Sequence, residues 1–575
     1  MKLIKGNPVS QGIAIGKIFV YKAFSCDVFE TYFEKGQEEK RLLQYEDAMK
    51  AAAIELNAVI EKLEKENDDK SKIFEAHLEI LEDEVISDEI RASIREELAM
   101  PDYAVEKSFS AFAALLGRAN DPLIAARAAD LRDVRNRLLR ILHGEKEKNL
   151  SVLNEQVVVV AHDLLPSDTA TLDRSKVLGI VTEVGGATSH SAIIARGFGI
   201  PAILGVPEAT VILRDGEECI VDALEGTVYV RPDTFTLDSF MAKRAVFGEE
   251  AKEIAKFIDK EALLKSGEKI MIGLNVGSDE DSDDYRHCDF VGLLRSEFLY
   301  MQSDHMPTEE EQYRTYVQVL KNAKGRPVTL RTLDIGGDKT LPYLELPKED
   351  NPFLGNRALR LCLSHPDLFH VQLRAALRAS AEGPLWLMFP MVGTMDDIRA
   401  ARAAVDRAKQ ELRTEHVPFD ENIMIGIMIE IPSIAQIADL AVKEVDFASV
   451  GTNDLAQYTH AVDRMNANIA GYYQSFSPSM FRILGHIFSE FNKAGKPISV
   501  CGELGGDPLA VVVLAGLGLR KMSMSGSNIA RVKRMLSKFT LQEVEEIAET
   551  ARVLPTQKEI LQYLKDKTGE KTGLR

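Results

Sequence analysis

The segment Ile423-Met424-Ile425-Gly426-Ile427-Met428-Ile429-Glu430-Ile431-Pro432 is an apolar run that ends in a carboxylate and a proline. A short apolar run closed by a strand-breaking residue predicts a buried β-strand. Glu430 then stands directly after that strand, at its carboxyl end. The same pattern, a buried run followed by polar residues, recurs through the second half of the chain and decides the fold expected there.

From Lys269 onward, runs of this kind alternate with helical stretches. The candidate strands are Ile270–Val276, Phe290–Leu294, Val328–Leu333, Leu385–Met391, Ile423–Ile429, Phe447–Val450, Ile498–Val500 and Lys521–Met524. Eight apolar strands with helices between them, over about 300 residues, predict a (β/α)₈ barrel. In that fold the active site lies at the carboxyl ends of the strands.

Polar side chains follow several of these strands. They are Arg295 after the second strand, Arg331 and Lys339 at the third, Glu430 after the fifth, Asn453, Asp454 and Arg464 after the sixth, and Cys501 after the seventh. Any one of them alone would be interpreted as a solvated loop residue. Gathered at one barrel face, such charges need a ligand. They indicate an anion with phosphate and carboxylate oxygens, bound by arginine, together with a hard divalent cation held by Glu430 and Asp454.

Cys501 has two interpretations. A free cysteine is ordinarily buried packing. Because Cys501 follows a strand and stands beside the charged cluster, we interpret it instead as an acid or base of the site.

A second informative segment is Gly185-Gly186-Ala187-Thr188-Ser189-His190-Ser191-Ala192-Ile193-Ile194-Ala195-Arg196. The glycines let the backbone approach an anion, and Thr188 and Ser189 add hydroxyl donors. The apolar run after His190 predicts the start of a helix, whose N-terminus favours negative charge. The plainer alternative is a structural histidine behind an N-capping hydroxyl. The paired glycines and hydroxyls, with Gly199-Ile200-Pro201-Ala202 closing the segment, favour a histidine that accepts a phosphoryl group.

The first half of the chain combines two patterns. Short apolar runs with turns predict an α/β domain made of residues 1–20 plus 145–232. Apolar spacings of three and four, with almost no glycine, predict a helical insert at 21–144. A charged, glycine-poor helix at 233–265 is expected to link these parts to the barrel at 266–575.

Composition excludes some classes of partner. The chain has 575 residues, with 70 Lys and Arg against 89 Asp and Glu, and its formal net charge is -19 at pH 7. This charge disfavours nucleic acid and anionic membranes as partners. Five scattered cysteines without a Cys-x-x-Cys pair are typical of a reducing cytoplasm, without disulfides or a zinc site. We expect neither a signal peptide nor membrane insertion, since no long apolar window is present.

These residues resemble enzyme I of the bacterial sugar phosphotransferase system (PTS), a family of phosphoenolpyruvate (PEP)–protein phosphotransferases. Gly-Gly-x-Thr-Ser-His is shared more widely among PEP-utilising enzymes. The longer motifs that match are Gly292–Phe298, Asp334–Lys339, Asn351–Gly355 and Gly451–Leu455. The resemblance covers essentially the whole chain. It implies a multidomain α/β fold: a swivelling phosphohistidine domain with an inserted helical bundle, followed by a barrel that binds PEP and forms a homodimer.

The resemblance also implies individual roles. His190 would carry the phosphoryl group from PEP to the histidine of HPr, a small carrier protein, as pyruvate is released in the first step of PTS sugar uptake. The ligands of PEP would be Arg295, Arg331, Arg464, Asn453 and Asp454, with Lys339 and Arg357 as supporting cations. Glu430 and Asp454 would bind Mg²⁺, and Cys501 would protonate the enolate carbon.

The helical insert is similar to the region that docks HPr. Five acidic side chains crowd one part of it: Glu75, Glu79, Glu82, Asp83 and Glu84. A charge cluster is more commonly a solvated face. HPr of this family has a basic rim, so the resemblance implies electrostatic docking that salt weakens.

One residue departs from the family pattern, since Ala187 stands where arginine is usual. Two alternative functions stay open. One is a PEP synthase or pyruvate phosphate dikinase, which would need an ATP-binding domain before the phosphohistidine domain. The other is a regulatory nitrogen-type enzyme I, which usually carries a sensor domain in front. Here only the strand start and the helical insert precede the histidine motif, which favours enzyme I of the sugar system.

Overall fold

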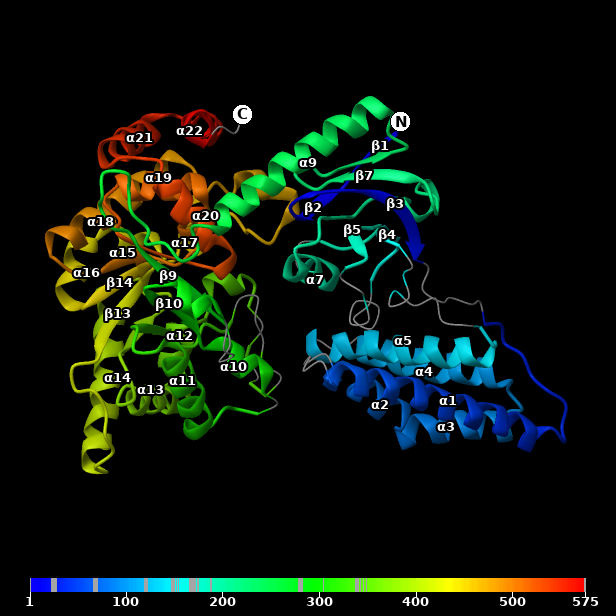
Figure 1. Ribbon diagram of the computed structural model, residues 1–575. Helices are drawn as coiled ribbons and strands as arrows, with labels where there is room; N and C mark the ends of the chain where they lie inside the picture. Colours follow the sequence, from blue (N-terminus) through cyan, green and yellow to red (C-terminus); the bar gives the residue numbers. More distant parts are fainter. Residues whose placement is uncertain are drawn as a thin grey trace. The chain divides into compact units, whose positions relative to one another are not determined.

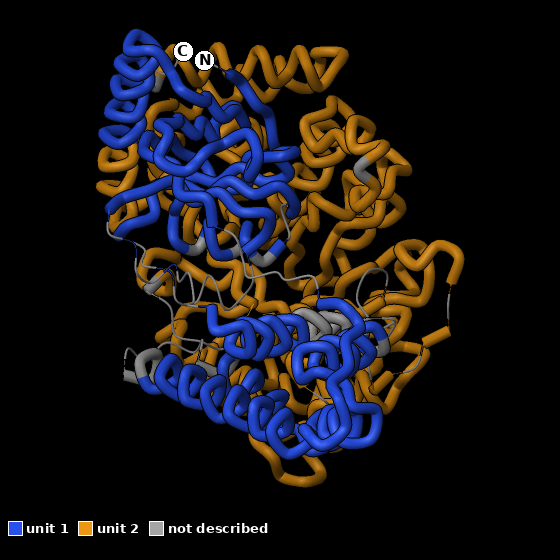
Figure 2. Tube along the Cα trace, turned by 90° about the vertical axis from the view of Figure 1, so that its right-hand side faces the viewer, with its two compact units in different colours: residues 1–250 blue, residues 251–575 orange. Residues whose placement is uncertain are grey.

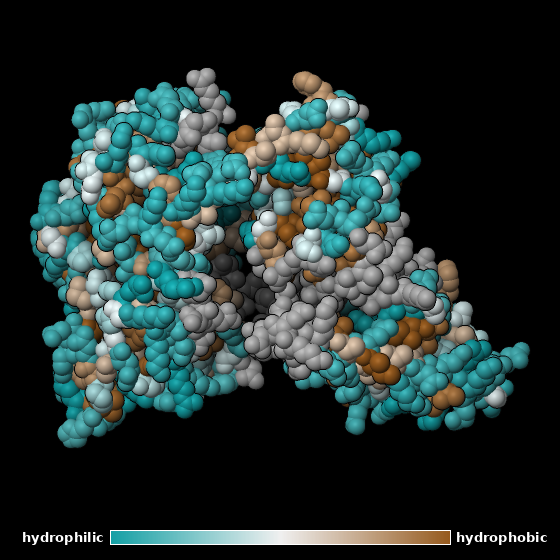
Figure 3. All heavy atoms as spheres, viewed as in Figure 1, coloured by the Kyte–Doolittle hydropathy of each residue, from teal (hydrophilic) through white to brown (hydrophobic). Residues whose placement is uncertain are grey.

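The computed structural model (Figure 1) describes residues 2–21, 28–65, 71–117, 122–145, 150, 153, 155–164, 172, 175–186, 189–277, 283–303, 305–336, 341, 343–344, 346–347 and 349–572. Two compact units contain them, Met1–Glu250 and Ala251–Arg575 (Figure 2). The visible surface of the barrel unit is largely hydrophilic, with small apolar patches (Figure 3). No helix within the described ranges combines the length and apolarity of a membrane span.

A mixed sheet forms the α/β part of the first unit. In the described residues its order is β1-β8-β7-β3-β4-β5-β6-β2. The strands are β1 (Lys2–Lys5), β2 (Asn7–Ser10), β3 (Ile13–Tyr21), β4 (Val157–Ala161), β5 (Val177–Thr182), β6 (Ala202–Leu204), β7 (Glu218–Asp222) and β8 (Thr227–Val230). Strands β3 to β6 run parallel, so their carboxyl ends meet at one edge. Helices α7 (His190–Phe198) and α8 (Ala209–Ile212) complete this part.

Four consecutive valines explain why β4 is central. Val157 and Val159 pack into the apolar core on one face of the sheet, whereas Val158 and Val160 pack into the core on the other face. A strand buried on both faces needs apolar side chains at every position, and β-branched residues suit it.

Helices α1 to α5 form an apolar core of their own. They are α1 (Glu38–Lys65), α2 (Ser71–Leu81), α3 (Glu84–Glu96), α4 (Pro101–Gly117) and α5 (Pro122–Leu142). On α1 the buried side chains recur every four residues, at Ala48, Ala52, Leu56 and Ile60. The chain leaves the sheet after β3 and returns in β4, which pairs in parallel with β3. These helices are therefore inserted between two neighbouring strands.

The second unit is built on a closed barrel of eight parallel strands, counted over its described residues. The strands are β9 (Met271–Val276), β10 (Phe290–Arg295), β11 (Val328–Arg331), β12 (Leu385–Phe389), β13 (Met424–Ile429), β14 (Phe447–Val450), β15 (Ile498–Val500) and β16 (Lys521–Met524). The barrel predicted from the sequence is confirmed. Strand β12 ends before Met391, because that residue has a left-handed φ of 54°, which no strand residue adopts.

Helices surround the barrel and cover the outward faces of its strands. They are α10 (Glu297–Gln302), α11 (Glu309–Ala323), α12 (Leu359–Ser364), α13 (Pro366–Ala379), α14 (Met395–Thr414), α15 (Pro432–Gln436), α16 (Ala438–Glu444), α17 (Thr452–His460), α18 (Pro478–Lys493), α19 (Pro508–Gly516), α20 (Gly526–Leu536), α21 (Leu541–Val553) and α22 (Gln557–Thr572). Their apolar faces and the outer strand residues share one core.

Helix α9 (Thr234–Ala255) is shorter than the helix predicted at 233–265. Beyond it, Ala262 and Leu264 are buried in the barrel core, and Leu263 between them bridges Lys269. Alternate burial needs an extended backbone. Packing against the barrel therefore overrides the helical preference of this charged stretch.

Gly516, the last residue of α19, packs closely against the backbone of α21. A Cβ built there would lie 1.9 Å from the backbone oxygen of Val544 in α21. Gly516→Ala should therefore destabilise the barrel unit by about 3 kcal/mol in urea unfolding, because overpacking forces two helices apart. The matched control is Gly485→Ala in α18, where the added Cβ would meet Leu517 at an ordinary 3.4 Å. Equal urea midpoints for the two variants would contradict the close approach.

Candidate active site

A cavity of about 240 Å³ opens at the carboxyl ends of the barrel strands. It gathers most of the residues singled out in the sequence: Arg295, Arg331, Arg357, Glu430, Asn453, Asp454, Arg464 and Cys501. Lys339 lies outside the described residues. His190 belongs to the first unit, where it is the first residue of α7.

Arg331 is the last residue of β11 and is buried beneath the cavity. Its guanidinium pairs with Glu297, the first residue of α10, and lies 2.8 Å from Oδ2 of Asp334. Burial lowers the pKa of Arg331, but the carboxylates of Asp334 and Glu297 raise it by more than burial lowers it. The pKa of Arg331 is therefore above its ordinary value. Arg331 therefore stays charged inside the protein.

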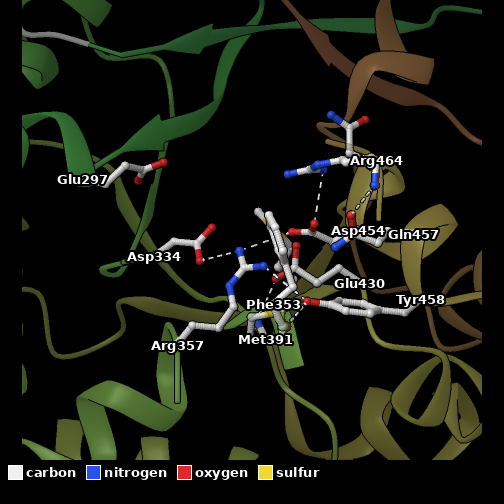
Figure 4. Close-up of polar contacts among 12 residues, drawn as sticks. Glu297, Asp334, Phe353, Arg357, Met391, Glu430, Asp454, Gln457, Tyr458 and Arg464 are labelled. Atoms are coloured by element: carbon white, nitrogen blue, oxygen red, sulfur yellow. Dashed lines mark hydrogen bonds and ion pairs between the residues drawn. The ribbon is translucent and has the colours of Figure 1, made fainter. Parts of the chain in front are cut away.

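Arg357 joins two strand ends of the site (Figure 4). Its Nη2 donates to Oδ1 of Asp334 at 2.9 Å and lies 3.4 Å from Oδ2 of Asp454. Its Nη1 donates to the Tyr458 hydroxyl at 3.2 Å. Tyr458 in turn donates to the backbone oxygen of Phe353. Asp334 is thus shared between two guanidinium groups, Arg331 and Arg357.

Helix α17 positions the opposite wall of the cavity. Asn453 and Asp454 stand in its first turn, directly after β14. Oδ1 of Asp454 lies 3.1 Å from Nη1 of Arg464, and Oδ1 of Asn453 accepts the backbone N–H of Glu503 at 3.0 Å. The backbone N–H of Arg464 donates to Oε1 of Gln457 at 3.0 Å. The chain therefore turns back after α17 and brings Arg464, ten residues beyond Asp454, into contact with Asp454.

Glu430 is a buried carboxyl group beside two other carboxylates of this network. It is 1% exposed, and its Oε1 accepts the backbone N–H of Met391 at 2.7 Å. Burial, together with the charges of Asp454 and Asp334, raises the pKa of Glu430 from 4.5 to about 8. Arg331 and Arg357 oppose this shift without cancelling it. Because burial is the largest cause of the shift, Glu430 keeps its proton near neutral pH when no cation is bound.

Cys501 lies at the end of β15 and is 4% exposed. Burial raises the pKa of its thiol, although the Ser449 side chain acts in the opposite direction. A thiol with a raised pKa keeps its proton near neutral pH. In this environment Cys501 is suited to donate a proton rather than to attack as a thiolate.

Sequence reasoning missed three members of the network. Glu297 follows β10 and Asp334 follows β11, just as Glu430 follows β13. A carboxylate shortly after a predicted strand would therefore have identified both residues from the sequence. Tyr458 stands four residues after Asp454, on the same face of α17. These three side chains hold the arginines in place.

His190 begins α7, and its side chain lies outside what the structure describes. Ser189 is the N-cap, and its Oγ accepts the backbone N–H of Ala192 at 3.3 Å. Gly199 ends the helix with a φ of 64°, and Gly185 has a φ of 109°, so both glycines adopt backbone that other residues avoid. The capping alternative holds for Ser189, and it leaves the hydroxyl hydrogen of that residue for a ligand. Ala187 and Thr188 lie outside the described residues.

Comparison with known proteins places the chain in a family. Residues 5–127 match the N-terminal model of the PEP-utilising enzymes, residues 153–226 match the mobile domain and residues 251–541 match the PEP-binding domain. A phosphoenolpyruvate-protein phosphotransferase of Bacillus sp. (strain S) is 41% identical over 567 residues, covering 98% of both chains. The one of Bacillus subtilis (strain 168) is 39% identical over 569 residues, covering 98% of this chain and 100% of the relative.

Among solved structures, an NMR solution structure of an enzyme I protein is 39% identical and covers 43% of this chain and 99% of its own, with a TM-score of 0.40. The full-length identity and the matching models show that the chain belongs to the PEP-utilising enzyme family.

Glu430 makes the stability of the barrel depend on pH. The pKa of Glu430 rises from 4.5 to about 8 on folding. Between these pH values the unfolded chain has lost the proton, whereas the folded protein still holds it. The free energy of unfolding therefore falls as pH rises from 4.5 to about 8. Glu430→Gln preserves the acceptor for Met391 and removes this charge. With a chelator present, the variant should gain about 1–3 kcal/mol over the parent protein at pH 8, and much less at pH 5.5. An equal gain in stability at the two pH values, measured by thermal unfolding, would contradict the raised pKa of Glu430.

Proposed function

We propose that this chain takes the phosphoryl group of PEP onto His190 and passes it to a histidine of a small carrier protein, HPr, with release of pyruvate. The observation that carries the proposal is the barrel cavity, in which arginines, buried carboxylates and a protonated thiol converge. The relatives that are named for this reaction match 98% of the chain. The proposed setting is the first step of sugar uptake by the phosphotransferase system.

The three arginines Arg295, Arg331 and Arg464 are the proposed ligands of PEP. Guanidinium groups donate in pairs to phosphate and carboxylate oxygens, and PEP carries both. Arg331 is held by Glu297 and Asp334 before any ligand arrives, and Arg464 is held by Asp454. Asn453 and Asp454 would contact the phosphate, while Arg357 braces Asp454. Such preorganised charge is the main source of catalysis in phosphoryl transfer.

The residues present fit a Mg²⁺ ion. Glu430 and Asp454 offer the oxygen ligands that this ion takes, commonly one or two carboxylates together with substrate oxygens. Burial raises the pKa of Glu430, and the charges of Asp454 and Asp334 raise it further, so a cation placed here would favour the ionised carboxylate. We propose that these two side chains hold Mg²⁺ with PEP. When bound, the ion supplies positive charge for the phosphate and for the enolate.

The chemistry then needs one nucleophile and one acid. The neutral Nε2 of His190 attacks phosphorus, the new N–P bond replaces the P–O bond, and pyruvate enolate leaves. The Cys501 thiol gives its proton to the enolate carbon, which yields pyruvate and a thiolate that solvent protonates again. Burial of the thiol supports this role, because it keeps the proton in place until the enolate forms.

His190 has two partners in this scheme, PEP in the barrel and the carrier protein. One imidazole cannot contact both at once, so we propose that the phosphohistidine domain swivels between them about the stretch 233–265. The helical insert is the proposed docking surface for the carrier. Val85, 67% exposed, stands there beside the acidic Glu82 and Glu84. Asp83 instead accepts the N–H groups of Val85 and Ile86 as the N-cap of α3, so its charge already has a structural role.

A homodimer through the barrel is part of the proposal. Three large apolar side chains near the mouth of the barrel are well exposed: Leu354 at 64%, Met465 at 60% and Tyr472 at 70%. A hollow of about 640 Å³ beside the site is lined by Phe353, Leu354 and Ile469. Apolar side chains gathered around a hollow are typical of an association surface.

The proposed location is the cytoplasm. The cysteines within the described ranges are free thiols, which supports a reducing compartment.

The first test of the proposal is His190→Ala. With PEP labelled in its phosphate and Mg²⁺ present, the parent protein should gain an acid-labile, base-stable label and pass it to purified HPr. The variant should gain none, because the attacking imidazole is gone. His370→Ala, which removes a histidine paired with Glu411 on the barrel surface, serves as the control and should label normally. Undiminished label on the His190 variant would refute the proposed acceptor.

The second test separates phosphoryl transfer from proton transfer. Cys501→Ala should still label His190 but release pyruvate at a rate lowered by about 10²-fold or more, because general-acid catalysis is worth that much. In D₂O, deuterium should enter the methyl group of the product without facial preference. Pyruvate release at the parental rate would show that Cys501 only fills space.

A further inference from the structure

The interior of the barrel contains two hydroxyl groups that the proposed reaction leaves without a role. Ser449 in β14 and Ser499 in β15 are partners in the register of these two strands. The residues that follow them, Val450 and Val500, pack outward into the core shared with the surrounding helices. Because side chains alternate along a strand, Ser449 and Ser499 point into the barrel.

The two hydroxyl groups form a chain that ends at the sulfur of Cys501. Ser499 Oγ donates to Ser449 Oγ at 2.9 Å, and both side chains are buried. The hydrogen bond between Ser449 and Cys501 lowers the pKa of the thiol, so Ser449 is the donor and sulfur the acceptor. The thiol itself donates to the backbone oxygen of Val450, at a distance of 3.8 Å from Sγ. Each hydroxyl therefore donates toward Cys501.

The other end of this chain reaches a small cavity at the amino ends of the barrel strands. Ser499, Trp386 and Lys521 are among its lining residues. Its volume of about 10 Å³ is close to the least that holds one water molecule. The Lys521 ammonium lies 5.0 Å from the ring centroid of Trp386 and 5.1 Å from that of Phe290. Burial lowers the pKa of Lys521, although Asp289 opposes the shift, so this ammonium releases a proton more readily than an exposed lysine does.

Cys501 stands between the hydroxyl chain and the active-site cavity. It lines that cavity, and it is 4% exposed. In the proposed reaction, pyruvate occupies the cavity at the moment when Cys501 becomes a thiolate. A proton from the active-site side must then pass the product, whereas the hydroxyl chain reaches the sulfur from inside the barrel.

We propose that Ser449 and Ser499 relay a proton to Cys501 from the cavity at the amino ends of the strands. The inference rests on the proposed function, because it assumes that Cys501 is the acid. The O–H bond of Ser449 breaks as the S–H bond forms, and Ser499 passes its own proton to the Ser449 oxygen. A water molecule beside Lys521 replaces the proton of Ser499. The ammonium of Lys521 protonates the hydroxide that remains, and solvent protonates the amine, so the net change is one solvent proton moved to sulfur.

The test compares the first turnover with later ones, because the relay acts only after Cys501 has lost its first proton. A single geometric isomer of PEP with one deuterium and one tritium at C3, used in ordinary water, reports the face at which the proton adds. With Mg²⁺ and less PEP than protein, Ser499→Ala should form pyruvate with the parental facial preference. Cys501→Ala should show no preference even then.

With excess PEP and purified HPr, Ser499→Ala should lose the facial preference over many turnovers, because the enolate leaves before Cys501 has regained its proton. Pyruvate release should slow about tenfold, less than the about 10²-fold expected when the acid itself is removed. Ser499→Thr keeps the hydroxyl and should restore both the rate and the facial preference.

The matched control is Ser523→Ala. Ser523 is another fully buried serine of a barrel strand, and its hydroxyl donates to Oδ1 of Asn275 at 2.5 Å. This variant should keep the parental facial preference over many turnovers. The inference alone would be overturned if Ser499→Ala also kept the preference, or if Ser523→Ala lost it equally. Absence of facial preference in the parent protein would instead overturn the role proposed for Cys501, and the inference with it.

Discussion

The alternating series of carboxylates and guanidinium groups at the barrel mouth is the interaction on which the rest of the site depends. It runs from Glu297 through Arg331, Asp334, Arg357 and Asp454 to Arg464. Removing charges from water is costly, so a buried series of this kind is a poor source of stability. Its value is geometric, because each charge inside the series is held between two opposite charges and loses the freedom to turn elsewhere.

The series also leaves little positive charge unpaired, because four arginines and four carboxyl side chains line the cavity. The arginines are largely used in pairing with Glu297, Asp334 and Asp454, and Glu430 adds a further carboxylate beneath them. An anion alone would add negative charge beside these carboxyl groups. In the proposed function a divalent cation and an anion bind together, so that the cation would meet the carboxylates and the anion would meet the guanidinium groups. Metal and substrate are thus expected to bind as a pair.

The carboxyl edge of the sheet in the first unit shows the same physical device on a smaller scale. There Thr210 holds Glu183, and Glu183 holds His162, so that one side chain is aimed by two others. Both sites stand where parallel strands end, because successive strands deliver their following residues to one edge there.

Much of this organisation was available in the sequence. The spacing of apolar runs determined the barrel and its strands, since a buried strand must be apolar and must end where polar residues begin. The residues after those strands determined most of the cavity lining, as Arg331, Glu430 and Cys501 illustrate. The helical insert followed from the spacing of apolar residues, because that spacing reports which face of a helix is buried.

What the sequence left open was pairing across long separations. Whether Asp334 meets Arg331, Arg357 or both is set by the closure of the barrel, as is the return of Arg464 to Asp454. Partnership of His162 with Glu183 depends on the register of β4 against β5, and the early end of α9 depends on burial of Ala262 and Leu264. Local sequence determined which residues end each strand. Only the tertiary structure decided which charges meet, because the strength of an ion pair depends on distance in space and not on separation along the chain.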